Sequence, residues 1–73
     1  MREWLKNLRI EKKLTMKETG EKLHISESYY CAIENGERQK NMDMVLASGI
    51  AAVFQIPIAE VVRMELSWKH GRA

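Results

Sequence analysis

Apolar side chains recur every three or four positions along most of this chain, and sustained alternation of apolar and polar residues is absent. The first spacing places apolar residues on one face of an α-helix, whereas a half-buried strand requires alternation. Runs of β-branched residues are short, and Pro57 is the single proline. The pattern therefore predicts an all-α fold built from five helices, with no strand.

The first predicted helix covers residues 2–12. Trp4, Leu5 and Leu8 share one face of this helix and are expected to enter the core. Leu14 is expected to close the connection that follows against the same core. The charged side chains of this region are expected to lie mostly in solvent: Arg2, Glu3, Lys6 and Lys13.

Two shorter helices are predicted next, and each begins at a recognisable cap. Thr15 and Glu18 have the spacing of a capping box, in which each side chain accepts a hydrogen bond from the other residue's backbone N–H. This helix is expected to run to Leu23. Ser26 is a good N-cap for the next helix, residues 27–35, and the glycine that follows is expected to end it.

A fourth helix is predicted where five apolar residues fall at helical intervals, with Asn41 or Asp43 as its N-cap. These residues are Met42, Leu46, Ile50, Val53 and Phe54. Pro57 suits the first turn of a fifth helix, because a backbone N–H would have no helical partner there. The last helix is expected to continue toward Trp68, and the chain is expected to fray from Lys69 onward.

Length and composition indicate one small domain, expected over residues 1–66, followed by a C-terminal tail over residues 67–73. Cys31 is the only cysteine, so neither an intramolecular disulfide nor a cysteine-based zinc site is expected. No apolar run reaches about 18 residues and no signal-peptide pattern is present, which indicates a cytoplasmic protein without membrane association. The formal net charge of +2 permits a polyanionic partner without requiring one.

The sequence carries no pattern that predicts catalysis. His24 and His70 are isolated from each other and from paired carboxylates, so they do not indicate a metal site or a general base. Cys31 has no partner motif for a nucleophile, and no glycine-rich phosphate loop is present. We therefore expect no enzyme activity, no metal, no cofactor and no small-molecule ligand.

Several short motifs are shared with a known family. They are Leu5 with Leu8-Arg9, Leu14-Thr15, Leu23 with Ile25-Ser26, and Tyr29 with the run Ile33-Glu34-Asn35-Gly36-Glu37-Arg38. Over residues 5–62 the chain resembles the phage repressor and Cro family, the XRE-type helix-turn-helix. The resemblance implies a compact, repressor-like domain whose third helix, residues 27–35, enters the major groove of double-stranded DNA.

The resemblance also implies roles for individual residues. Arg9 and Glu34 are expected to form a partly buried ion pair between the first and third helices. Phosphate contacts are implied at the start of the second helix and after the third, at Met16, Lys17, Asn35, Arg38 and Lys40. Base contacts are implied on the third helix, at Glu27, Ser28 and Ala32, with Tyr29 at the rim of this surface.

The chemistry of these side chains predicts modest sequence specificity. Glu27 can accept from a cytosine amine, Ser28 can contact a base or a phosphate, and Ala32 can touch a thymine methyl. No arginine, asparagine or glutamine stands there for bidentate readout, so phosphate contacts and DNA shape are expected to contribute. Two alternatives stay open. The helix dipole alone favours an acidic Glu27 at a helix start, and the basic residues are interleaved with carboxylates as on an ordinary solvated surface.

Four positions depart from the family pattern. Thr19 and Gly20 stand where an aliphatic residue followed by alanine is usual, and Gly20 is expected to weaken its helix by up to about 1 kcal/mol relative to alanine. His24 stands at a turn position usually held by glycine, where a positive φ is expected. Tyr30 replaces an aliphatic residue, and the small side chains at 19 and 20 are expected to accommodate its volume.

Two functions of different classes follow. The first is a homodimeric DNA-binding transcriptional repressor whose dimer contact lies on the fifth helix, at Val61, Val62, Met64, Leu66 and Trp68. The second is a protein-interaction module, such as an antirepressor or an antitoxin-like partner, that retains the fold without DNA affinity. The short, acidic outer face of the third helix motivates the second hypothesis.

Overall fold

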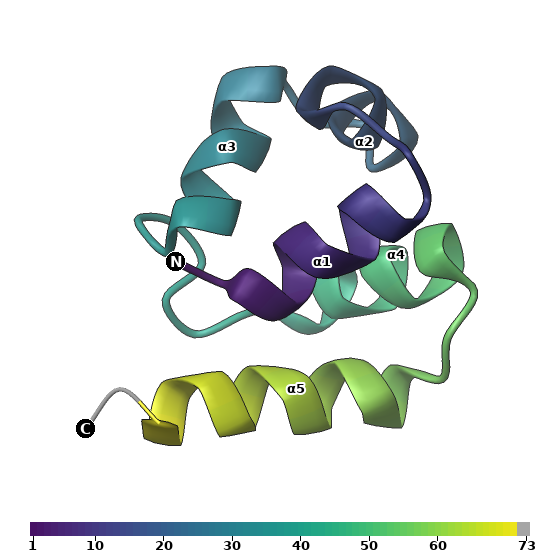
Figure 1. The fold of residues 1–73 in the computed structure, drawn as a ribbon. Coiled ribbons are helices and arrows are strands. Elements are labelled where there is room, and N and C mark those ends of the chain that lie inside the picture. The colour runs from purple at the N-terminus through teal and green to yellow at the C-terminus, as the bar shows by residue number, and fades with distance from the viewer. Residues whose placement is uncertain (72–73) are drawn as a thin grey trace.

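Five α-helices surround a single core in the computed structural model, which describes residues 1–71 (Figure 1). The helices are α1 (Glu3–Glu11), α2 (Met16–Lys22), α3 (Glu27–Asn35), α4 (Met44–Phe54) and α5 (Ile58–Gly71). No strand occurs within these residues. The all-α prediction with its five helices is therefore confirmed.

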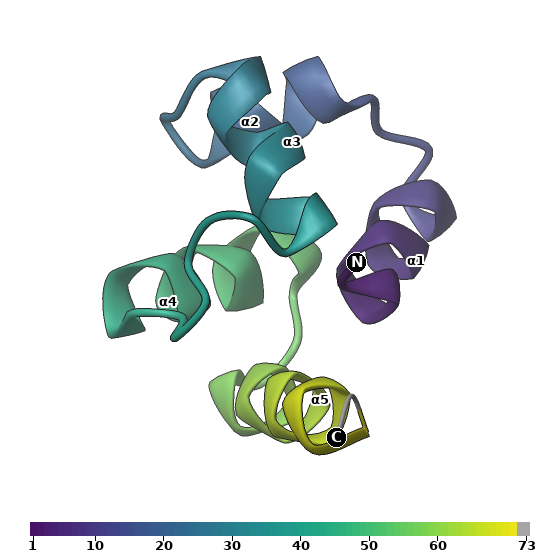
Figure 2. The same cartoon turned by 90° about the vertical axis from the view of Figure 1, so that its left-hand side faces the viewer.

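The helices are arranged so that α2 and α3 stand together at one end of the molecule and α5 lies along the other (Figure 1). The helices α1 and α4 lie on opposite sides of the space between these ends (Figure 2). The core side chains come from α1, α3, α4 and α5: Leu5, Tyr30, Ile33, Ala47, Ile50, Phe54 and Val61. Since α3 buries one side in this core, its other side is left for contacts outside the molecule.

The helix ends follow from local hydrogen bonds. Thr15 and Glu18 form the expected capping box, and the Ser26 side chain accepts from the backbone N–H of Tyr29. Gly36 ends α3 in the left-handed conformation, with a φ of 84°. Asp43, and not Asn41, caps α4 by accepting from the backbone N–H of Leu46 at 2.7 Å. Helix α4 thus begins after Met42, which packs against the core from the preceding loop.

Two expectations about the ends of the chain are wrong. Arg2 is fully buried rather than solvated, because its guanidinium forms an ion pair with Glu65 of α5. Helix α5 continues through Gly71, so residues 69–71 are helical and not frayed. The contacts of Trp68 and Lys69 with the N-terminus and with Asn41 hold this last turn in place. The remaining part of the expected tail, residues 72–73, lies outside the described residues.

Gly20 lies against the turn that follows α2. A Cβ at this position would lie 3.0 Å from the carbonyl oxygen of Ile25 and 3.3 Å from that of Ser26. These are backbone atoms, which cannot swing aside as a flexible side chain would. The expected gain in helix propensity from Gly20→Ala is therefore offset by a close contact with the turn.

His24 has the expected positive φ, at 61°. A side chain with a Cβ is unfavourable in this left-handed region, whereas glycine adopts it freely. We expect His24→Gly to raise the free energy of unfolding by roughly 0.5–1 kcal/mol, measured by urea unfolding. His24→Ala is the matched control because it keeps the Cβ and should give no such gain. Equal stabilisation by both variants would mean that the histidine ring, and not the backbone, is responsible.

Candidate nucleic-acid interface

Helix α3 presents an exposed polar end next to the start of α2. Glu27 and Ser28 are exposed in its first turn. Together with Ser26, Met16 and Cys31 they line a shallow hollow of about 450 Å³. The structure thus brings together three residues that the sequence assigned separately to phosphate and base contacts, namely Met16, Glu27 and Ser28.

The other predicted contact residues lie around this end of α3 and along the loop after it. Lys17, Asn35, Arg38 and Lys40 are exposed, whereas Tyr29 and Ala32 are half-buried. The backbone carbonyl of Ala32 accepts from the N–H groups of Glu37 and Arg38, at 2.9 and 3.2 Å. The loop therefore starts by folding back on α3. Asn35 donates to the Cys31 sulfur at 3.6 Å, so its amide is directed along the helix.

The loop of residues 36–43 is fixed to both neighbouring helices through Gln39. Its amide nitrogen donates to the hydroxyl of Tyr29 at 2.9 Å and to the carboxylate of Asp43 at 3.0 Å. Its amide oxygen accepts from the backbone N–H of Asp43, also at 3.0 Å. Tyr29 thus has a role that sequence reasoning missed, because it anchors the loop that carries Arg38 and Lys40.

Asp43 links the loop to α4 in a pH-dependent way. The backbone N–H of Leu46, and then the side chain of Gln39, stabilise its carboxylate and lower the pKa of Asp43 below the ordinary value of 3.8. Since the folded pKa lies below the unfolded one, this stabilisation is present above pH 3.8 and is lost as the pH falls through the folded pKa.

We expect Asp43→Asn to reduce the acid sensitivity of the fold, because asparagine still caps a helix but does not titrate. Free energies of unfolding measured between about pH 5 and pH 2 should fall less steeply in the variant than in the unaltered protein. Glu18 and Glu60, whose pKa values are also lowered, keep some acid sensitivity in both proteins. Parallel curves would contradict the role given to Asp43.

The ion pair expected between Arg9 and Glu34 is present in the structure. Two nitrogens of the guanidinium donate to the two carboxylate oxygens, at 2.9 and 3.1 Å, and a third donor reaches the carbonyl of Leu14 at 3.1 Å. Glu34 is fully buried, whereas the Arg9 side chain is 13% exposed. The hydrogen bonds that Arg9 donates to the Glu34 carboxylate raise the pKa of Arg9. The pair joins α1 to the C-terminal half of α3.

The Tyr30 hydroxyl lies in the same region of the core. Burial, followed by the neighbouring Glu34 carboxylate, raises the pKa of Tyr30 above its ordinary value. Within the described part of the chain the hydroxyl oxygen has no hydrogen-bond partner. The Tyr30 side chain was expected in the core and lies there.

Sequence reasoning missed a second buried ion pair, between Arg2 and Glu65. Arg2 Nε donates to a Glu65 oxygen at 2.8 Å, and Trp4 donates to the same oxygen at 3.3 Å. The burial of Glu65 could have been predicted from the sequence, because Glu65 falls on the same face of the helix as Val61 and Trp68. A carboxylate on a buried face requires a partner cation.

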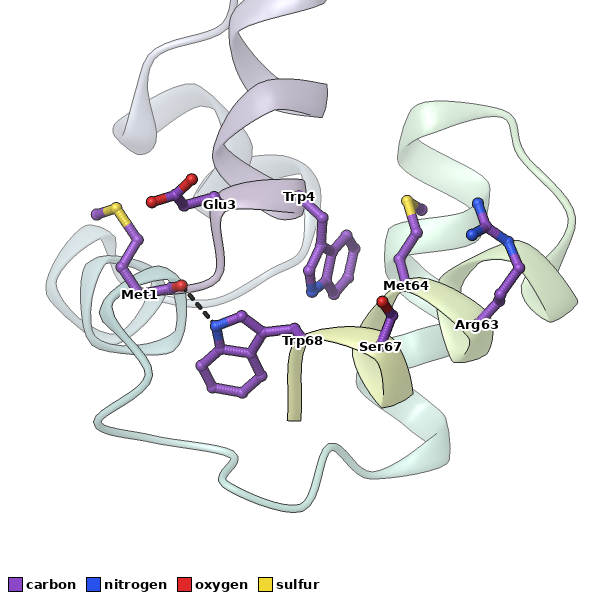
Figure 3. Close-up of a pocket in the computed structure, with 7 residues that line it drawn as sticks. All are labelled: Met1, Glu3, Trp4, Arg63, Met64, Ser67 and Trp68. Atoms are coloured by element: carbon purple, nitrogen blue, oxygen red, sulfur yellow. Dashed lines mark hydrogen bonds between the residues drawn. The ribbon is translucent and has the colours of Figure 1, made fainter. Parts of the chain in front are cut away.

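The surface of α5 differs from the predicted dimer contact. Val61 belongs to the core and is not available to a second copy. Met64 and Trp68 are half-buried in a hollow between α1 and α5 that also contains Trp4 (Figure 3). The Trp68 indole donates to the carbonyl of Met1 at 2.6 Å, which the dashed line in Figure 3 marks. The exposed apolar residues of α5 are Ile58, Val62 and Leu66, at 42, 46 and 48%.

Residues 1–71 contain no group of three or more His, Cys, Asp or Glu side chains that could hold a metal ion. No single helix in this part of the chain is long and apolar enough to cross a membrane. Only α4 and α5 taken together, bent by 116° where they meet, reach the required length and composition.

Two short helices joined by a tight turn, with the second exposing polar residues at its start, define a helix-turn-helix protein. This chain belongs to that family, since the helix-turn-helix family model matches residues 5–61. It is also similar to YqaF of Bacillus subtilis (strain 168), an uncharacterized HTH-type transcriptional regulator. The two are 43% identical over 42 residues, which cover 58% of this chain and 55% of YqaF. The match thus spans about half of that relative, and no solved structure matches the chain.

Family membership supports two expectations from the sequence: the resemblance to the XRE-type family and the absence of enzyme activity. The matched range, residues 5–61, includes α1 to α4 and the start of α5, in agreement with the resemblance to the XRE-type family. A helix-turn-helix is a unit of nucleic-acid recognition and not of catalysis. The family therefore supports the expectation that the chain is not an enzyme.

Proposed function

We propose that this protein is a DNA-binding transcriptional regulator that inserts α3 into the major groove of double-stranded DNA. The observation that carries the proposal is the exposed N-terminal turn of α3, with Glu27 and Ser28, in a domain that also exposes basic residues on the neighbouring segments. Lys17 is exposed in the first turn of α2, and Arg38 and Lys40 are exposed on the loop after α3. Basic residues can position a protein on phosphates while the polar residues of α3 meet base edges.

In this proposal the basic residues position the protein and α3 discriminates among sequences. Lys17, Arg38 and Lys40 neutralise phosphates and release counterions. Ser28 and Glu27 meet base edges, and Met16 packs against the sugar-phosphate backbone beside them. Ala32 is only half-exposed, so its contact is limited to one thymine methyl. Specificity is accordingly modest and depends partly on DNA shape.

The direct test is the salt dependence of binding to a duplex of arbitrary sequence. Each phosphate contact contributes a slope of about −0.9 to the logarithm of the association constant against the logarithm of the salt concentration. We expect measurable binding at low salt, with a slope of roughly −3 for each protein copy if three basic residues engage. A slope near zero would exclude a phosphate-contacting interface.

We further infer that the protein acts in the cytoplasm as a homodimeric repressor that occupies its site and excludes other proteins. Two-fold operators are matched by two-fold dimers. The surface that supports this is the stripe of Ile58, Val62 and Leu66, whose members are spaced four residues apart on α5. Sedimentation should show a dimer at high micromolar concentration. A monomer under those conditions would remove the homodimer from the proposal.

The second candidate is a protein-interaction module on the same fold. It is favoured by the outer surface of α3, where the exposed residues of the first turn are an acid and a serine and none is basic. A carboxylate in the major groove repels phosphates unless it finds a cytosine amine. No binding to duplex DNA at low salt would favour this candidate over the regulator.

A further inference from the structure

The side chain of Arg2 connects α5 to the loop proposed to contact DNA. Its guanidinium is fully buried and forms two parallel hydrogen bonds with the Glu65 carboxylate, at 2.8 and 2.9 Å. The remaining donors reach backbone carbonyls at the end of α3 and in the loop. These are Ile33 at 2.6 Å, Arg38 at 3.0 Å, and Gln39. The Arg2 guanidinium thus binds three backbone carbonyls at the end of α3 and in the first part of the loop, which is the segment that carries Arg38 and Lys40.

The backbone of Gln39 indicates that these contacts hold the loop in a conformation it would not keep alone. Its φ is 56°, which is unfavourable for a residue with a Cβ and persists where surrounding contacts impose it. The carbonyl of Gln39 accepts from Arg2, and its side chain bonds to Tyr29 and Asp43. The loop is therefore held at Gln39 in two ways: its backbone carbonyl binds the buried Arg2, and its side chain binds Tyr29 and Asp43.

The guanidinium is in turn held by the N-terminus and by α5. The backbone N–H of Arg2 donates to the carbonyl of Glu34 at 2.7 Å. The ring of Trp68 lies 4.8 Å from the guanidinium carbon, and Lys69 donates to the Asn41 side chain at the far end of the loop. Figure 1 shows the N-terminus beside the loop that follows α3. The position of the loop thus depends on α5.

We propose that Arg2, held by Glu65, is a positioning residue for DNA binding that fixes the loop of residues 36–43 so that Arg38 and Lys40 meet phosphates. The assignment rests on the DNA-binding function proposed above. Arg2 itself does not touch DNA, because it is fully buried. Loss of the Arg2 contacts leaves the charges of Arg38 and Lys40 in place but lets the loop adopt other conformations. The loop must then be ordered when DNA binds, and the cost of this ordering weakens binding.

The test replaces the buried pair with apolar residues, in the double variant Arg2→Met with Glu65→Leu. Such a replacement removes the loop contacts without leaving an unpaired buried charge, and it often preserves folding. We expect association with a random-sequence duplex to weaken about tenfold, and the salt slope to become shallower by roughly 1 to 2. An unchanged affinity and slope in the folded variant would overturn the proposal.

The matched control is Arg63→Met with Glu60→Leu, which removes the other arginine-glutamate pair of α5. That pair is exposed, and the hydrogen bonds of the Arg63 guanidinium go to Glu60 on the same helix. Both double variants remove one arginine and one glutamate, so the net charge of +2 is unchanged in each. Long-range attraction to DNA is therefore equal in the two, and the control should bind as the unaltered protein does. An equal loss in both would also overturn the proposal.

A second variant, Arg2→Lys, tests the positioning role of Arg2 if the double variant does not fold. Lysine keeps a buried cation beside Glu65 but lacks the planar fork that reaches several carbonyls at once. We expect weaker binding, a shallower salt slope and faster amide hydrogen exchange in residues 37–41 than in the unaltered protein. Slow exchange and full affinity would contradict the positioning role. Absence of DNA binding by the unaltered protein would instead contradict the DNA-binding function itself, while the exchange measurement still reports on the loop.

Discussion

Arg9→Met is expected to lower the free energy of unfolding by about 3–5 kcal/mol, because it leaves a fully buried carboxylate at Glu34 without its partner. A domain of this length has a total stability of only roughly 4–11 kcal/mol, so the loss should move the urea midpoint far toward zero.

Two further variants separate the charge from the packing at this site. Arg9→Met combined with Glu34→Leu removes the unpaired charge and should regain most of the lost stability. Tyr30→Phe removes a neighbouring hydroxyl that has no hydrogen-bond partner among the described residues, and it should not destabilise the fold. A loss below about 1 kcal/mol for Arg9→Met alone would show that Glu34 is hydrated in solution, contrary to its burial here.

Arg38→Ala combined with Lys40→Ala should produce the largest loss of DNA binding. Both side chains are exposed and follow α3, where the second phosphate backbone would lie. Loss of two phosphate contacts should reduce the salt slope by roughly 1.8 and weaken binding about tenfold to a hundredfold. The loss should be nearly the same for every duplex sequence, because phosphate contacts carry no sequence information.

The control for this pair is Lys12→Ala combined with Lys13→Ala. These two lysines are also exposed, and they lie in the turn between α1 and α2 and not on the loop after α3. The control removes the same charge, so it reports the contribution of net charge alone. If both double variants weaken binding equally, the attraction depends on net charge alone, and Arg38 and Lys40 make no specific phosphate contacts.

The parts of the fold that were predictable from sequence are those set by local rules. Helical spacing, the capping box of Thr15 and Glu18, and Gly36 after α3 depend on residues within a few positions of one another. The positive φ of His24 was expected from the resemblance, because the family usually has glycine at this turn position. Such features need no knowledge of how the helices pack.

The features that sequence reasoning missed depend on distant partners. Arg2 and Glu65 are 63 positions apart, and each alone has the composition of a solvated residue. The hydrogen bond from Gln39 to the Tyr29 hydroxyl likewise forms only once the loop folds back on α3. Val61 was placed on a dimer surface because an apolar residue of α5 can face either the core or a partner. Periodicity alone does not distinguish the two.

Insertion of α3 into the major groove can be tested by a selection of random duplexes at low salt, followed by footprinting of guanine N7 in any enriched site. We expect an enriched two-fold sequence with half-sites about one helical turn apart, protected in the major groove. Ser28→Ala should change the preferred bases, and Arg38→Ala should weaken all sites alike. No enriched sequence, or an enriched site in which no guanine N7 is protected, would contradict insertion of α3 into the major groove.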